Sequence, residues 1–224
     1  MTRKPIDKKA YDQLANRYRA IITDIICRAG SGHLGGALSL VEIMIVLYHR
    51  ILRVDPKNPK LPDRDRLVVS KGHAGPVLYT ALAEMGFFSE DWLPTLNADG
   101  TNLPSHCDMQ RTPGIDMTTG SLGQGLSAAC GIALAARMDG RKHRVFCIIG
   151  DGESNEGQIW EAALFGAHRK LDNLIAICDY NKLQIDGTTD EILNLEPLVS
   201  KWEAFGWETS EMDGHDWDSI EETF

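Results

Sequence analysis

The sequence has few of the features that mark secreted, membrane-spanning or nucleic-acid-binding proteins. Its five cysteines are scattered without a C-x-x-C pair, which is typical of reduced, structural thiols. Its formal net charge of −9 argues against a general nucleic-acid surface, because such a surface needs clustered lysine and arginine. The most apolar window, "ALSLVEIMIVLY", contains Glu42 and is too short to cross a bilayer. No secretory signal peptide is recognisable, so we expect a cytoplasmic protein.

Internal repeats and low-complexity tracts are also missing, and the composition is that of an ordinary globular protein. With 43% hydrophobic and 25% charged residues, the 224 residues predict a single folded domain over residues 1–224. We expect helices over residues 11–29, 39–51, 77–85, 126–138, 158–169 and 198–205 with another beginning at residue 216, and strands over 66–70, 145–149, 174–178 and 207–212. The alternation predicts an α/β fold: a doubly wound, mostly parallel sheet with helices on both faces.

The stretch "FCIIGDGESNEGQ" is an apolar strand that stops abruptly at Gly150, Asp151 and Gly152. Asn181 follows the next predicted strand, one βαβ unit further along. Because the carboxyl ends of parallel strands lie at one edge, the oxygens of Asp151 and Asn181 are expected to share one hard cation such as Mg²⁺. Few protein ligands suffice for Mg²⁺ when phosphate oxygens complete its shell, so the ligand is expected to be a diphosphate. The two glycines would let the backbone approach it closely.

A second glycine cluster, "TTGSLGQGLSAAC", places Gly120, Gly123 and Gly125 just before an apolar helix. Its order, G-x-x-G-x-G without a preceding strand, is not the dinucleotide-binding fingerprint, which disfavours a Rossmann dehydrogenase. Taken with Asp151, the cluster predicts a second wall of a cofactor cleft. The passage from residue 89 to 125 lacks regular periodicity, and long loops of this kind are usually functional.

Three histidines lie beside small residues in predicted loops: His33 in "GSGHLGG", His73 in "SKGHAG" and His106 in "LPSHCD". Imidazoles in such settings can bind sugar hydroxyls or phosphates and move protons near neutral pH. We therefore interpret these three as candidate site residues.

These motifs, together with "GDGESNEGQIWEAALFGAHRKLDNLIAICDYNKLQIDG", resemble in content and order the N-terminal, diphosphate-binding domain of transketolase. The resemblance runs from about Ala10 to Asp216. It implies a thiamine diphosphate-binding fold and a metal, Mg²⁺ or else Ca²⁺ or Mn²⁺, held by Asp151, Asn181 and the main-chain oxygen of Leu183. The resemblance further implies that His33 and His106 are catalytic residues facing the donor sugar, and that Glu156 joins an acidic cluster between subunits. The residues that it implies for binding thiamine diphosphate are His73, Gly120, Ser121, Leu122, Gly152 and Asn181.

The sequence departs from the commonest family pattern at Leu34 and Ser121, where proline is usual. More seriously, it has no pyrimidine-binding domain, which carries the glutamate that activates the cofactor, and no late histidine of the family. The resemblance therefore implies the N-terminal half of a split transketolase that transfers a two-carbon ketol unit from a ketose phosphate to an aldose phosphate. A partner chain would supply the pyrimidine domain, and we expect a homodimer of this chain within a heterotetramer.

Two alternatives stay open at this point. The chain could be a subunit of another thiamine diphosphate enzyme, such as a 2-oxo acid dehydrogenase or a deoxyxylulose phosphate synthase, although the loop histidines favour a polyol substrate. It could also be a truncated, non-catalytic module that binds the cofactor or a partner chain.

Overall fold

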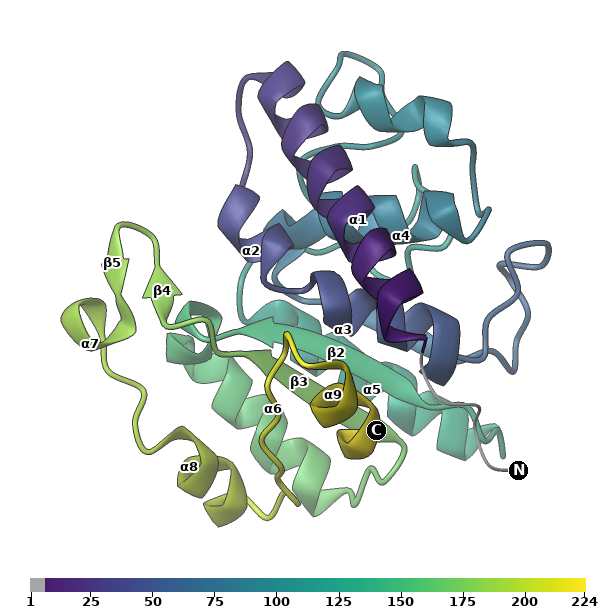
Figure 1. Cartoon of the computed structure of the whole chain (residues 1–224). Helices are drawn as coiled ribbons and strands as arrows, with labels where there is room; N and C mark the ends of the chain where they lie inside the picture. Colours follow the sequence, from purple (N-terminus) through teal and green to yellow (C-terminus); the bar gives the residue numbers. More distant parts are fainter. Residues whose placement is uncertain (1–6) are drawn as a thin grey trace. The chain divides into compact units, whose positions relative to one another are not determined.

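The computed structural model describes residues 7–224 of the chain (Figure 1). The chain divides into two compact units. One, which we call the helical unit, comprises Met1–Leu52, His73–Ser105 and Glu211–Phe224, and the other, the sheet unit, comprises Arg53–Gly72 and His106–Ser210. Among the described residues, no helix is both long and apolar enough to cross a membrane.

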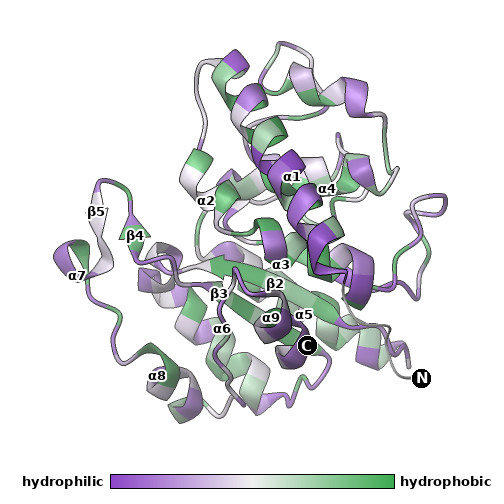
Figure 2. Ribbon diagram, in the orientation of Figure 1, coloured by the Kyte–Doolittle hydropathy of each residue, from purple (hydrophilic) through white to green (hydrophobic). Residues whose placement is uncertain are grey.

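The sheet unit is built on three parallel strands, β1 (Arg66–Val69), β2 (Val145–Gly150) and β3 (Leu174–Asp179), in the order β1-β2-β3. All six residues of β2 are buried, which fits the continuous apolar run expected of a central parallel strand, and Figure 2 colours this strand hydrophobic. Parallel pairing brings the carboxyl ends of all three strands to the same side of the sheet, which we call its carboxyl edge. The predicted α/β fold with a parallel sheet is confirmed.

Two helices of the sheet unit, α5 (Gln124–Met138) and α6 (Gly157–His168), pack against each other, and α5 also packs against the strands of the sheet. Their contact residues are mostly small, which lets the helices approach closely. The shared core comprises Leu126, Ala129, Cys130 and Ala133 of α5, Ile159, Ala162 and Ala163 of α6, and Val145, Cys147 and Ile149 of β2. Helix α8 (Leu198–Ala204) adds Leu198 and Trp202 to this core.

Short elements follow the strands at the carboxyl edge of the sheet. The 3₁₀-helix η4 (Gly152–Asn155) begins directly after β2 and leads into α6. After β3 the chain forms a small hairpin, β4 (Leu183–Gln184) and β5 (Gly187–Thr188), followed by α7 (Thr189–Ile192). A reciprocal capping box between Thr188 and Glu191 fixes the start of α7.

The helical unit contains α1 (Lys8–Ala29), α2 (Leu34–Leu38), α3 (Val41–Val46), the π-helical turn η1 (Leu47–Ile51), α4 (Gly75–Glu84), the 3₁₀-helix η3 (Glu90–Thr95) and α9 (Trp217–Thr223). The 3₁₀-turn η2 (Gly72–Ala74) has its first residue, Gly72, in the sheet unit and its other two residues in the helical unit. Helix α1 buries Tyr18, Ile22 and Ile25, as its three-and-four spacing predicts. Helix α9 is held by the indole of Trp217, which donates to Asp12 at 2.8 Å.

Two expectations about secondary structure are wrong. The single helix expected over residues 39–51 divides into α3 and the π-helical turn η1. Residues 207–212 form no strand, and within residues 7–224 the parallel sheet has three strands. The ring of Trp207 packs edge-on against Trp202 at 5.1 Å, and its indole donates to the carbonyl of Ala163 on α6. The segment is thus anchored to helices of the sheet unit, and no strand pairs with it.

Candidate cofactor site

Asp151 connects the two loops that leave the carboxyl ends of β2 and β3. Its Oδ1 accepts a hydrogen bond from the amide of Gly152, and its Oδ2 accepts one from the amide of Lys182, both at 2.7 Å. Next to Lys182, the side-chain oxygen of Asn181 accepts from the amide of Leu183 at 2.9 Å. The structure therefore brings the Asp151 turn and the loop of Asn181 and Leu183 together at one edge of the sheet.

The chemistry of this set suits a hard divalent cation. Asp151 offers a carboxylate, Asn181 an amide oxygen and Leu183 a main-chain oxygen, all of them oxygen donors. Burial raises the pKa of Asp151, the hydrogen bonds from Gly152 and Lys182 oppose this rise, and the charge of Asp179 adds to it. A bound cation would stabilise the ionised carboxylate that burial disfavours. Within residues 7–224, no group of three or more His, Cys, Asp or Glu side chains is placed to hold a metal ion.

Gly152 and Gly120 each occupy a place where a side chain would collide. A Cβ at Gly152 would lie 2.8 Å from Cγ of Gln184, which packs the turn closely against the β4–β5 hairpin. Gly120 has a φ of 138°, and a Cβ there would lie 2.9 Å from Cδ2 of His106. His106 therefore packs directly against the loop of Gly120, Ser121, Leu122 and Gly123, which we call the glycine loop.

The glycine loop leads into α5 and borders a small cavity of about 190 Å³ in the sheet unit. Met117, Thr118, Thr119, Ser121, Gln124 and Gly125 line this cavity. Ser121 thus faces an open space, and Leu122 beside it is exposed. Gly72, which precedes His73, also belongs here: a Cβ on it would lie 2.8 Å from the amide nitrogen of Gly120.

The predicted histidines fall into two groups. His33 and His73 belong to the helical unit, where their ring centroids are 5.1 Å apart. His106 belongs to the sheet unit, together with the predicted metal ligands and the glycine loop. Within the helical unit His33 and His73 are neighbours, and within the sheet unit His106 lies against Gly120 while Asp151 contacts the loop of Asn181 and Leu183.

Sequence reasoning missed a buried polar network beneath these loops. The carboxylate of Glu153 accepts hydrogen bonds from the hydroxyl of Ser70 and from the amides of Gly123 and Gly150, the latter two at 2.9 and 3.0 Å. Glu153 therefore fixes the end of β1, the end of β2 and the glycine loop relative to one another. Its place inside "GDGESNEGQ" was a signal, but its partners are distant in the sequence.

A buried ion pair was missed as well. Lys71, directly after Ser70, donates from Nζ to the carboxylate of Asp179, the last residue of β3. Both side chains are buried. The sequence signal was a lysine beside His73 in "SKGHAG" and an aspartate closing an apolar strand.

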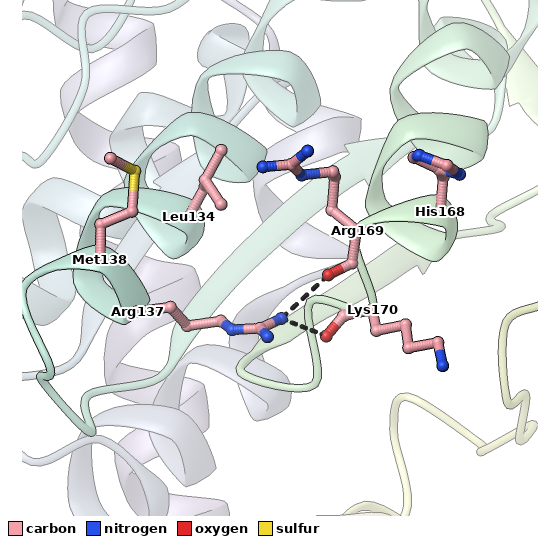
Figure 3. A pocket seen from close by; sticks show the side chains of 6 residues that line it. All are labelled: Leu134, Arg137, Met138, His168, Arg169 and Lys170. Carbon is pink, nitrogen blue, oxygen red and sulfur yellow. Dashed lines mark hydrogen bonds between the residues drawn. The ribbon is translucent and has the colours of Figure 1, made fainter.

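A second cavity, of about 470 Å³, lies where α5 and α6 end, at the opposite ends of these helices from the glycine loop (Figure 3). Leu134, Arg137, Met138, His168, Arg169 and Lys170 line it. The guanidinium of Arg137 donates to the carbonyls of Arg169 and Lys170, as the dashed lines in Figure 3 show. Basic side chains at helix carboxyl ends commonly bind the last free carbonyls, which accounts for this cluster.

Sequence comparisons identify proteins related to this chain. A family model described as the thiamine diphosphate binding domain of transketolase matches residues 10–224. The 6-deoxy-6-sulfo-D-fructose transketolase subunit of Clostridium sp. (strain MSTE9) is 59% identical over 206 residues, which cover 92% of this chain and 75% of that protein. An apulose-4-phosphate transketolase subunit of Actinobacillus succinogenes is 46% identical over 218 residues, covering 96% of this chain and 79% of that protein.

Solved structures of transketolases also resemble this chain. Transketolase from Campylobacter jejuni matches with a TM-score of 0.92 at 34% sequence identity, covering 98% of this chain and 35% of that one. The chain therefore spans about a third of the length of that transketolase. With a family model matched over nearly its whole length, the chain belongs to the transketolase family, as a thiamine diphosphate binding domain.

Proposed function

We propose that this chain is the diphosphate-binding subunit of a split transketolase, transferring a two-carbon ketol unit between sugars. The observation that carries the proposal is the pair of relatives named as transketolase subunits, of which the chain covers 75% and 79%. Thiamine diphosphate, when bound, supplies the carbon–carbon cleavage chemistry, and the protein supplies binding and orientation.

The roles proposed for individual residues are those that the family resemblance implies. Asp151, Asn181 and the main-chain oxygen of Leu183 would hold Mg²⁺, which is supported by the contact between their loops. Gly152, the loop of Gly120, Ser121 and Leu122, and His73 would bind thiamine diphosphate, with Asn181 contributing through the metal. His33 and His106 would contact the donor sugar.

A partner chain would bring the pyrimidine-binding domain. The word "subunit" in the names of both relatives supports this proposal. We propose that residues 1–224 act as one cofactor-binding domain in an assembly of two such chains and two partner chains. A cytoplasmic location is supported by the five cysteines, all free, which a reducing compartment would keep as thiols.

The donor is proposed to be a ketose whose far end carries an anionic group. One relative is named for 6-deoxy-6-sulfo-D-fructose and the other for apulose 4-phosphate, so a sulfonate and a phosphate are both represented. The higher identity to the first, 59% against 46%, makes the sulfonated ketose the first donor to test.

The test is a product assay on this chain mixed with its partner subunit, thiamine diphosphate, Mg²⁺ and an aldose phosphate acceptor. D-fructose 6-phosphate and 6-deoxy-6-sulfo-D-fructose serve as donors, and pyruvate is the comparison. We expect an acceptor lengthened by two carbons from at least one ketose, only when both chains are present. Turnover of pyruvate alone would instead indicate a 2-oxo acid or deoxyxylulose phosphate enzyme, and silence in every pairing would indicate a non-catalytic module.

A further inference from the structure

Lys71 places a buried positive charge across the carboxyl edge of the sheet. Its side chain is only 2% exposed and its Nζ donates to the carboxylate of Asp179, which is 8% exposed. A Cβ built on Gly150 would lie 3.5 Å from Cδ of Lys71. One side chain thus starts at the end of β1, passes the end of β2 and binds the end of β3.

This ion pair lies beside the proposed metal ligand. The amide of Asp151 donates to the main-chain oxygen of Asp179 at 3.2 Å, so the two aspartates are neighbours on adjacent strand ends. The ammonium of Lys71, bound to Asp179, therefore lies next to the strand end that carries Asp151.

Three buried carboxylates lie at this edge, those of Asp151, Glu153 and Asp179, and the buried ammonium of Lys71 is paired with Asp179. Negative charge concentrated in this way attracts a divalent cation and opposes a diphosphate. The ammonium of Lys71 reduces both effects.

Stability alone gives no reason to keep such a pair. Burying a lysine and an aspartate costs solvation, and replacing a buried ion pair by apolar side chains is often neutral or stabilising. A role in the electrostatics of the edge explains why charged groups occupy this position.

We propose that Lys71 is a positioning residue of the metal–diphosphate site: its buried ammonium, bound to Asp179 beside Asp151, favours the diphosphate and restrains binding of the free cation. The inference rests on the proposed function. It assigns to Lys71 opposite effects on the two ligands, which a purely structural role would not produce.

The test measures two dissociation constants on the chain in complex with its partner subunit. Binding of Mn²⁺ alone is measured by the electron paramagnetic resonance of the free ion, and binding of thiamine diphosphate by calorimetry in saturating Mg²⁺. Removing one charge beside such a site is expected to change a dissociation constant by about tenfold. We therefore expect Lys71→Met to bind Mn²⁺ about tenfold more tightly and thiamine diphosphate about tenfold more weakly. Asp179→Asn removes the opposite charge and is expected to give the reverse pair of shifts.

A matched control removes a buried, paired cation near the amino ends of the strands of the same sheet. Arg64 is buried, forms an ion pair with Asp116 and precedes β1, so Arg64→Met should lower stability but leave both affinities within about twofold. The double variant Lys71→Met/Asp179→Asn keeps the net charge and should return both affinities toward those of the wild type.

Each outcome has a distinct meaning. If the wild type binds both ligands and Lys71→Met weakens both or neither, the inference is overturned while the proposed function stands. If Lys71→Met fails to fold, Asp179→Asn decides: weaker Mn²⁺ binding with tighter thiamine diphosphate binding supports the inference. Weaker binding of both ligands by Asp179→Asn overturns it. If the wild-type complex binds neither ligand, the proposed function itself fails.

Discussion

Asp151 is the residue on which the candidate site depends most, because its two carboxylate oxygens hold the turn after β2 and the loop after β3. We expect Asp151→Ala to abolish metal-dependent binding of thiamine diphosphate, since it removes both a proposed metal ligand and the link between the loops. The measurement is a calorimetric titration with Mg²⁺ and with chelator. Binding that remains as tight as in the wild type would exclude Asp151 from the site.

His106 is expected to affect turnover more than cofactor binding. It packs against Gly120 in the sheet unit, and removal of a catalytic imidazole commonly costs about 10²-fold or more in rate. His106→Ala should therefore lower kcat/KM for the donor by about that factor while thiamine diphosphate still binds. His168→Ala, at the end of α6, is the control and should change neither quantity. An equal loss of cofactor binding in His106→Ala would mean that His106 only supports the glycine loop.

Among individual residues, the sequence predicted the polar residues that follow the strands but not the buried contacts of Glu153 and Lys71. Asp151 and Asn181 could be found because each comes just after an apolar run. Glu153 and Lys71 could not be assigned partners, because their contacts span 83 residues to Ser70 and 108 residues to Asp179. Only the folded sheet brings these ends together.

Among the elements, the start of α5 is very closely packed. The amide of Gly125 donates to the hydroxyl of Ser70 at 3.1 Å, and a Cβ on Gly125 would collide with that hydroxyl. Gly125→Ala should therefore lower the free energy of unfolding by about 2–3 kcal/mol through overpacking. Gly131, in the same helix, has open space where a Cβ would lie, and Gly131→Ala should raise the free energy of unfolding by about 0.5–1 kcal/mol.

Urea unfolding of the two glycine variants measures this difference directly. Equal effects of Gly125→Ala and Gly131→Ala on the free energy of unfolding would contradict the close contact between α5 and the end of β1. A loss at Gly125 alone would also be expected to weaken the cofactor site, because the glycine loop enters α5 there.

Secondary structure could be predicted where one property dominates. Apolar runs gave β2 and β3 to within one residue, and three-and-four spacing gave α1, whose predicted start at residue 11 lies three residues inside the observed one. The strand expected over residues 207–212 was wrong because a strand needs a neighbour to pair with. Local alternation carries no information about that neighbour, and Trp207 packs on helices instead.

For the whole molecule, acid stability should depend partly on Asp65, which precedes β1. Burial raises the pKa of Asp65, but hydrogen bonds from Arg53 and Arg144 outweigh it and lower the pKa from 3.8 to about 2. Because the folded-state pKa is the lower one, the stabilisation is complete above about pH 4 and is lost as the pH falls toward 2.

The variant Asp65→Asn tests this pH dependence. It should lower the free energy of unfolding at pH 7 by about 1–2 kcal/mol, a value reduced for the partial exposure of both arginines. The difference between variant and wild type should shrink between pH 4 and pH 2. Urea unfolding at several pH values measures it, and a difference that stays constant over this range would show that Asp65 contributes through packing rather than charge.

The measurement that tests the central claim most directly is a calorimetric titration with thiamine diphosphate of this chain together with the proposed partner that carries the pyrimidine domain. It is done once in Mg²⁺ and once after chelation of the metal. The account predicts saturable binding in Mg²⁺ that disappears with the chelator. Binding that the chelator leaves unchanged, or no binding in either condition, would contradict a metal–diphosphate site at the carboxyl edge of the sheet.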